Sequence, residues 1–118
     1  MADCFENENG TIVIDPEVIA RFAGHAALDC FGIVGMASRS VKDGLAKLLK
    51  GDNVSRGVTV RKTDKGLIIN FHIIVSYGVN IKTVVKNLVS TVKYQVEDYS
   101  SMDVKAINVF VEGVRVID

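Results

Sequence analysis

Residues 67–77 read LIINFHIIVSY and form the longest β-type run in the chain. Side chains along a strand alternate between two faces, so one face here is entirely large and apolar, and we expect it to form the core: Leu67, Ile69, Phe71, Ile73, Val75 and Tyr77. The other face mixes polar and apolar side chains. The preceding Asp64-Lys65-Gly66 predicts a tight turn from an earlier strand that contains Val58 and Val60.

The segments on either side of this strand alternate between strand and helix patterns. A short β-branched run at 11–14 leads into a helix that Asp15 and Pro16 begin, and 33–37 reads as a short strand or extended link. Ser40–Lys50 has the capping-box pattern of a short helix. A long helix follows Asn80, with the apolar stripe Ile81, Val84, Val85, Leu88, Val92, Val96 and Tyr99.

The last predicted strand covers 107–116, where Gly113 indicates a bulge that returns Val114 and Val116 to the face of Val111. The predicted order is β-α-β-(short α)-β-β-α-β. We therefore expect an α/β fold of the α+β type: a two-layer sandwich with two main helices and a mixed sheet of four to five strands. Residues 1–118 form one domain, and 1–9 are expected to be flexible.

Composition excludes several classes of protein. The chain has 118 residues, with 14 Lys+Arg against 14 Asp+Glu, which argues against a dedicated polyanion-coating protein. Two cysteines, Cys4 and Cys30, provide no disulfide framework and favour a reducing cytoplasm. The acidic N-terminus is unlike a signal peptide, and no apolar run reaches the roughly 18 residues of a membrane span.

The residues with catalytic or metal-binding chemistry are few and scattered. His25, Cys30 and His72 have no partners at metal-ligand spacing, and Cys30 lies in an apolar helical stripe where a thiol packs as a small hydrophobe. A Cys–His nucleophile pair stays open, because spatial proximity is invisible in sequence. Glu112 stands alone on its strand. We expect no enzyme activity, no cofactor and no metal.

Two features point instead to binding. Residues 39–65 carry eight basic and three acidic residues, whereas residues 1–29 carry six acidic and one basic, so the strip could meet an anionic surface or the acidic end of another copy. Gly32-Ile33-Val34-Gly35 matches the Gly-x-x-Gly of a KH RNA-binding loop, which joins two helices. A KH-like RNA-binding module is therefore the alternative function, although nucleic acid is the less favoured partner.

Apolar side chains opposite the assumed core suggest self-association, because a soluble monomer rarely exposes a large apolar patch. They are Ile68, Ile74 and Phe110, unless the 40–50 segment covers them. Together with the basic strip they define the predicted interaction surface: Arg39, Lys42, Arg56, Arg61, Lys62, Ile68, Ile74 and Phe110.

The chain resembles the alkaline-shock protein family of Gram-positive bacteria, the envelope stress response proteins, over roughly residues 8–117. The resemblance lies in the order and spacing of several segments: 10–14, 32–36, 57–60, 75–79 and 109–114. It is similar to the short members that lack a membrane anchor.

The resemblance implies a non-enzymatic protein that associates with itself and acts near the envelope. It also implies a protein partner, either a membrane anchor protein or a dihydroxyacetone-kinase-like fatty-acid kinase. Such a protein would be cytoplasmic and would reach the membrane peripherally, through its partner. The family has no catalytic motif, so no active-site residue carries over.

Overall fold

The alternating stretch forms β6 (Gly66–Ser76), the central strand of a five-stranded sheet in the computed structural model, which describes residues 3–7, 10–37, 48–49 and 57–116. β5 (Val58–Thr63) runs antiparallel to β6 along the first half of β6. β3 (Ile33–Ala37) runs antiparallel to it along the second half. Parallel to it runs β7 (Val104–Arg115), along almost its whole length. Because a strand has only two edges, β3 and β5 share one edge of β6 and β7 occupies the other.

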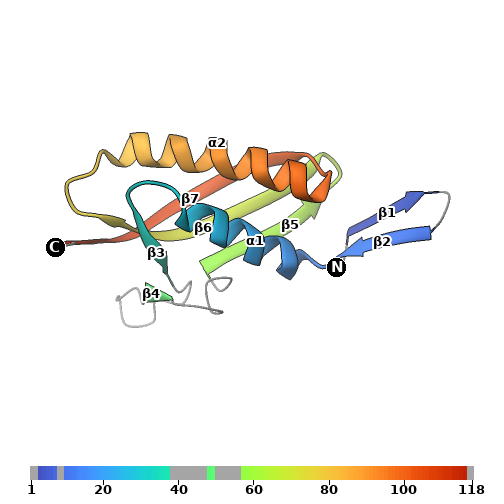
Figure 1. Cartoon of the computed structure of the whole chain (residues 1–118), viewed down its shortest axis with the longest axis horizontal. Coiled ribbons are helices and arrows are strands. Elements are labelled where there is room, and N and C mark those ends of the chain that lie inside the picture. Colours follow the sequence, from blue (N-terminus) through green and yellow to red (C-terminus); the bar gives the residue numbers. More distant parts are fainter. Residues whose placement is uncertain (1–2, 8–9, 38–47, 50–56, 117–118) are drawn as a thin grey trace.

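Two helices cover one face of this sheet (Figure 1). Helix α1 (Pro16–Leu28) begins where Asp15 Oδ1 accepts a hydrogen bond from the Glu17 backbone N–H at 2.8 Å, as its Asp-Pro start predicts. Helix α2 (Ile81–Ser100) is capped by Asn80, whose Oδ1 accepts from the Thr83 N–H at 3.1 Å. These caps supply acceptors for backbone donors that the first helical turn leaves unpaired.

The core lies between the helices and the predicted face of β6. Leu67, Ile69, Phe71 and Ile73 are completely buried, and Val75 is nearly so. The helices contribute small and branched side chains to the same cluster, among them Ile19, Ala23, Ala27, Val84, Leu88, Val92 and Val96. The two-layer α+β class, the mixed sheet and the two main helices are therefore as the sequence predicts.

Helix α2 is the crossover that makes β6 and β7 parallel, since parallel strands need a long connection. The predicted bulge near Gly113 is present: Ile73 pairs with Val111 and Ile74 with Gly113, which leaves Glu112 as the extra residue. Val114 then pairs with Val75 and so returns to the helix side, whereas Val116 follows the end of β7 and is 73% exposed. A second register shift leaves Lys105 unpaired between Val104 and Ala106.

Several elements differ from the sequence prediction. Asp3–Asn7 form β1, which pairs with β2 (Gly10–Ile14) in a hairpin that extends beyond the sheet (Figure 1). Leu48 and Leu49 form β4, beside β3, so their assignment to a short helix is wrong. The rest of the predicted helix at 40–50 lies outside the described residues.

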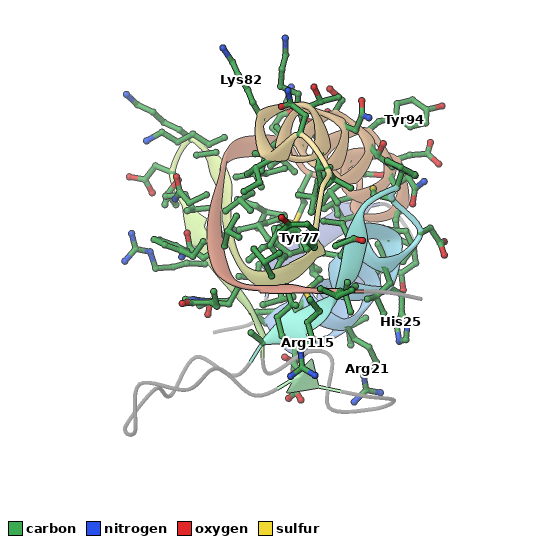
Figure 2. All side chains as sticks on the ribbon, turned by 90° about the vertical axis from the view of Figure 1, so that its left-hand side faces the viewer. Arg21, His25, Tyr77, Lys82, Tyr94 and Arg115 are labelled. Atoms are coloured by element: carbon green, nitrogen blue, oxygen red, sulfur yellow. The ribbon has the colours of Figure 1, made fainter. Side chains whose placement is uncertain are left out.

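Three aromatic or aliphatic side chains predicted for the core are exposed instead. β6 ends at Ser76, and Tyr77 is 72% exposed at the end of the molecule that faces the viewer in Figure 2. Ile81 and Tyr99 lie near the two ends of α2, and both are about half exposed. Tyr99 stacks on Phe22 of α1, with ring centroids 4.2 Å apart.

Candidate interaction surface

The sheet face opposite the helices, here called the outer face, carries the candidate site. Residues paired across neighbouring strands lie on the same face, so the register aligns its side chains in rows. One row runs from Arg61 through Ile68 to Ala106. The next row contains Thr59, Asn70 and Asn108, and it is followed by the pairs His72–Phe110 and Ile74–Gly113.

The most structured part of the outer face is formed by His72, Phe110 and Glu112. The His72 and Phe110 rings stack with centroids 4.9 Å apart, and His72 Nδ1 lies 2.6 Å from Glu112 Oε2. Glu112 follows Phe110 by two residues along β7, so alternation places its carboxylate on the outer face next to the His72–Phe110 pair, and it is also the extra residue of the bulge. A carboxylate bound to one ring nitrogen fixes the orientation of the imidazole.

An amide pair continues the polar band along β6 and β7. Asn108 Nδ2 donates to Asn70 Oδ1 at 2.9 Å, at an exposed position. The amides and the His72–Glu112 pair therefore link β7 to β6 by side chains as well as by the backbone ladder. Two polar contacts and one half-exposed ring make this face suited to recognition, which needs fixed polar groups around an apolar anchor.

The basic half of the predicted surface is only partly described. Arg39, Lys42 and Arg56 lie outside the described residues. Arg61 and Lys62 are both exposed on β5, but they occupy opposite faces: Arg61 pairs with Ile68 on the outer face and Lys62 with Leu67 on the helix side. Of these two cations, Arg61 alone can join the outer-face site.

The apolar half is smaller than predicted. Phe110 is 48% exposed, as expected for a contact residue. Ile68 is only half-buried in its row, whereas Ile74 is 1% exposed, so its prediction as an exposed patch residue is wrong. The alternation of residues along β6 reveals the face to which Ile74 belongs, but it does not reveal whether that part of the face is covered.

The remaining chemistry-bearing side chains are separated. His25 is exposed on α1, whereas the Cys30 thiol donates to the Ala26 carbonyl at 3.7 Å and its pKa is raised by burial. Among the described residues, no group of three His, Cys, Asp or Glu side chains can hold a metal ion. Sequence reasoning missed the His72–Glu112 pair, whose members are 40 residues apart.

The Gly-x-x-Gly segment does not form a KH-type loop. Gly32 has φ +85° and precedes β3, which contains Ile33, Val34 and Gly35, and Gly35 pairs with Ile74 in the sheet. A KH loop joins two helices and presents its backbone to nucleic acid. The prediction that Gly32–Gly35 forms a KH-type RNA-binding loop is therefore wrong.

A depression of about 470 Å³ lies beside the Phe22–Tyr99 stack. Its polar lining contains acidic and basic groups from α1, and Figure 2 shows Arg21 and His25 pointing away from the protein body. The described side chains there include Asp15, which already caps α1. Because both acidic and basic side chains line this open depression, its charge does not indicate which class of ligand would bind there.

Comparison with known proteins places this chain in a family. Residues 4–116 match the alkaline shock protein 23 family, which is described by a cell envelope-related function. The chain belongs to this family. It is 49% identical over 108 residues to the protein YloU of Bacillus subtilis, a match that covers 91% of this chain and 90% of that protein.

Other members of the family are more distant. Spy1614 of Streptococcus pyogenes is 37% identical, over 93% of this chain and 92% of its own. A streptococcal protein named as a stress response regulator gls24 homolog is 24% identical, over 90% of this chain and 59% of its own. No solved structure matches the chain. Neither helix in the described part of this family member has the length and apolar character for crossing a membrane.

Proposed function

We propose that this protein is a non-enzymatic scaffold or adaptor in the envelope stress response, which associates with itself and with a protein partner near the membrane. Membership of a family with cell envelope-related function supports the setting. The name of the streptococcal relative, a stress response regulator, supports the link to stress. In this role the protein is cytoplasmic and reaches the membrane peripherally, through its partner.

The observation that carries the proposal is Phe110 on the outer face. This 48% exposed phenyl ring stacks on the His72 imidazole, and the Glu112 carboxylate contacts Nδ1 of the same imidazole. Large aromatic side chains surrounded by fixed polar groups are typical anchors of protein interfaces. Arg61 at the other end of the same face adds a cation that can pair with an acidic partner.

Two classes of partner fit this adaptor role: a membrane anchor protein and a dihydroxyacetone-kinase-like fatty-acid kinase. Either would bring the scaffold to the envelope through a protein–protein contact. The test uses each purified candidate immobilised on a sensor surface, with the full-length protein as analyte. We expect saturable binding to one of them.

Phe110→Ala should weaken that binding at least tenfold, since interface aromatics commonly contribute above 1 kcal/mol and about 1.4 kcal/mol corresponds to tenfold. The matched control is Tyr94→Ala, which removes an aromatic ring that is 72% exposed on α2, away from the outer face. Equal binding by both variants would overturn the outer-face assignment. Absence of binding to either partner would overturn the adaptor role.

A further inference from the structure

The long strand β7 has an open edge. Among the described strands it pairs only with β6, while α2 covers its helix side (Figure 1). An edge strand presents a row of backbone donors and acceptors that another strand can use. Proteins usually protect such an edge with prolines, charges or a short length, and β7 spans Val104–Arg115 without a proline.

The middle of this edge has no charge at all. Residues 106–111 read AINVFV and are in continuous register with β6, between the two bulges at Lys105 and Glu112. Uncharged segments of about six residues with high β-propensity are those that pair with other strands when they are left open. The bulges limit the uninterrupted backbone ladder to this stretch, so residues beyond them meet a second strand through their side chains.

Charged residues flank the uncharged stretch in a self-complementary order. Asp103 and Lys105 precede it, and Glu112 and Arg115 follow it, so the signs along the chain are minus, plus, minus, plus. Asp103, Lys105 and Arg115 are exposed, and none of them forms an ion pair within the described part of the chain. Figure 2 shows Arg115 extending from the sheet away from α2.

We propose that the edge of β7 is a docking surface for a second copy of this chain. Two β7 strands pair in antiparallel fashion about a two-fold axis near Val109 and join the two sheets into one. This inference rests on the proposed self-association and specifies its geometry.

The charges select the antiparallel arrangement over the parallel one. Asp103 and Arg115 lie equally far from Val109 along the chain, so the two-fold brings Asp103 of one copy opposite Arg115 of the other, twice. Lys105 and the other copy's Glu112, which are four and three residues from Val109, also come near each other, offset by one position. Parallel pairing would align like charges, which is unfavourable between directly opposed strands. A two-fold perpendicular to the sheet also keeps both outer faces on one side.

Charge reversal tests this geometry on the full-length protein by sedimentation equilibrium over a concentration series. We expect a dimer in the wild type, and a dimer dissociation constant raised about tenfold by Asp103→Lys and by Arg115→Glu, because each creates two like-charge contacts. The double variant carrying D103K and R115E restores opposite charges and should return to within about twofold of the wild type.

The control is the pair Asp98→Lys and Lys82→Glu on α2, which makes the same changes of charge at exposed positions away from β7. Circular dichroism checks that each variant is folded. If the wild type is a dimer and D103K and R115E leave its dissociation constant unchanged, the β7 interface is overturned but self-association is not. A wild type that stays monomeric at every concentration would overturn both the interface and the proposed self-association.

Discussion

His72 Nδ1 and Glu112 Oε2 lie 2.6 Å apart, although their residues are 40 positions apart in the chain. Glu112 is the extra residue at the register shift of β7, two residues after Phe110, which pairs with His72. The half-exposed Phe110 ring stacks on the His72 imidazole. The His72–Glu112 contact therefore helps to hold Phe110 in place on the outer face. Pairing between β6 and β7 thus brings together the three side chains of the candidate site.

The contact between His72 and Glu112 should stabilise the fold, so the effects of replacing the two residues should not be additive. Glu112→Gln and His72→Ala are each expected to lower the free energy of unfolding, with a coupling of about 1 kcal/mol, because both side chains are mostly shielded from water. A double-mutant cycle in urea measures it. The Lys93–Glu97 pair, at 3.8 Å and more exposed, should show a coupling below about 0.5 kcal/mol. Strictly additive effects at His72 and Glu112 would contradict the contact.

Gly32 is required for steric reasons as well as for its backbone conformation. A Cβ atom there would lie 2.6 Å from Val84 Cγ2, at φ +85°, whereas Gly78 has φ +91° and nothing within 4 Å of an added Cβ. Gly78→Ala should therefore lower the free energy of unfolding by about 1 kcal/mol, from the backbone alone. Gly32→Ala should lose a further 1–3 kcal/mol or so by overpacking.

Thermal or urea unfolding measures both alanine variants under one condition. Adding Val84→Ala should recover part of the loss in Gly32→Ala and none of the loss in Gly78→Ala, since Val84 obstructs only the first position. Equal losses at Gly32 and Gly78 would show that the close approach of α2 is not needed.

The Cys30 thiol should react slowly. Burial raises its pKa, with Asp29 adding to the rise and a hydrogen bond with Thr91 opposing it. A raised pKa means less thiolate at neutral pH, and the thiolate is the reactive form. In a Cys4→Ser background, a chromogenic disulfide reagent should label native Cys30 more slowly than the urea-unfolded chain at the same pH.

The raised pKa of Cys30 also determines how the free energy of unfolding depends on pH. Because the pKa is higher in the folded state, protonated Cys30 contributes stability below the pKa of the unfolded thiol, about 8.5, and this contribution is lost as pH rises through the folded value. Cys30→Ser should flatten that alkaline decline in the free energy of unfolding. A native labelling rate equal to the unfolded rate would contradict the burial of the thiol.

Sequence patterns were sufficient where a local period determines the structure. The alternation in 67–75 identified the core face of β6, and the Asp15-Pro16 pair identified the start of α1. The Gly113 signal identified a bulge, because a glycine inside a strand weakens the regular ladder and is typical of such an irregularity. These features depend on neighbouring residues only.

The features that sequence missed depend on what covers a residue or on distant pairing. Ile74 lies on the polar side of β6 by alternation, yet it is buried. Tyr99 fits the helical stripe, yet it is about half exposed and stacks on Phe22. The partner of Glu112 is reached only through a parallel crossover, so no spacing in the chain could reveal it.

The most direct test of the proposed function is the mass of the protein in solution. Light scattering after size-exclusion chromatography, at low and moderate salt and over a range of concentrations, measures it for the full-length chain. The scaffold proposal predicts a concentration-dependent assembly larger than one chain, which is weakened by added salt because opposite charges assist it. A single species with the 12.8 kDa mass of one chain under every condition would contradict it.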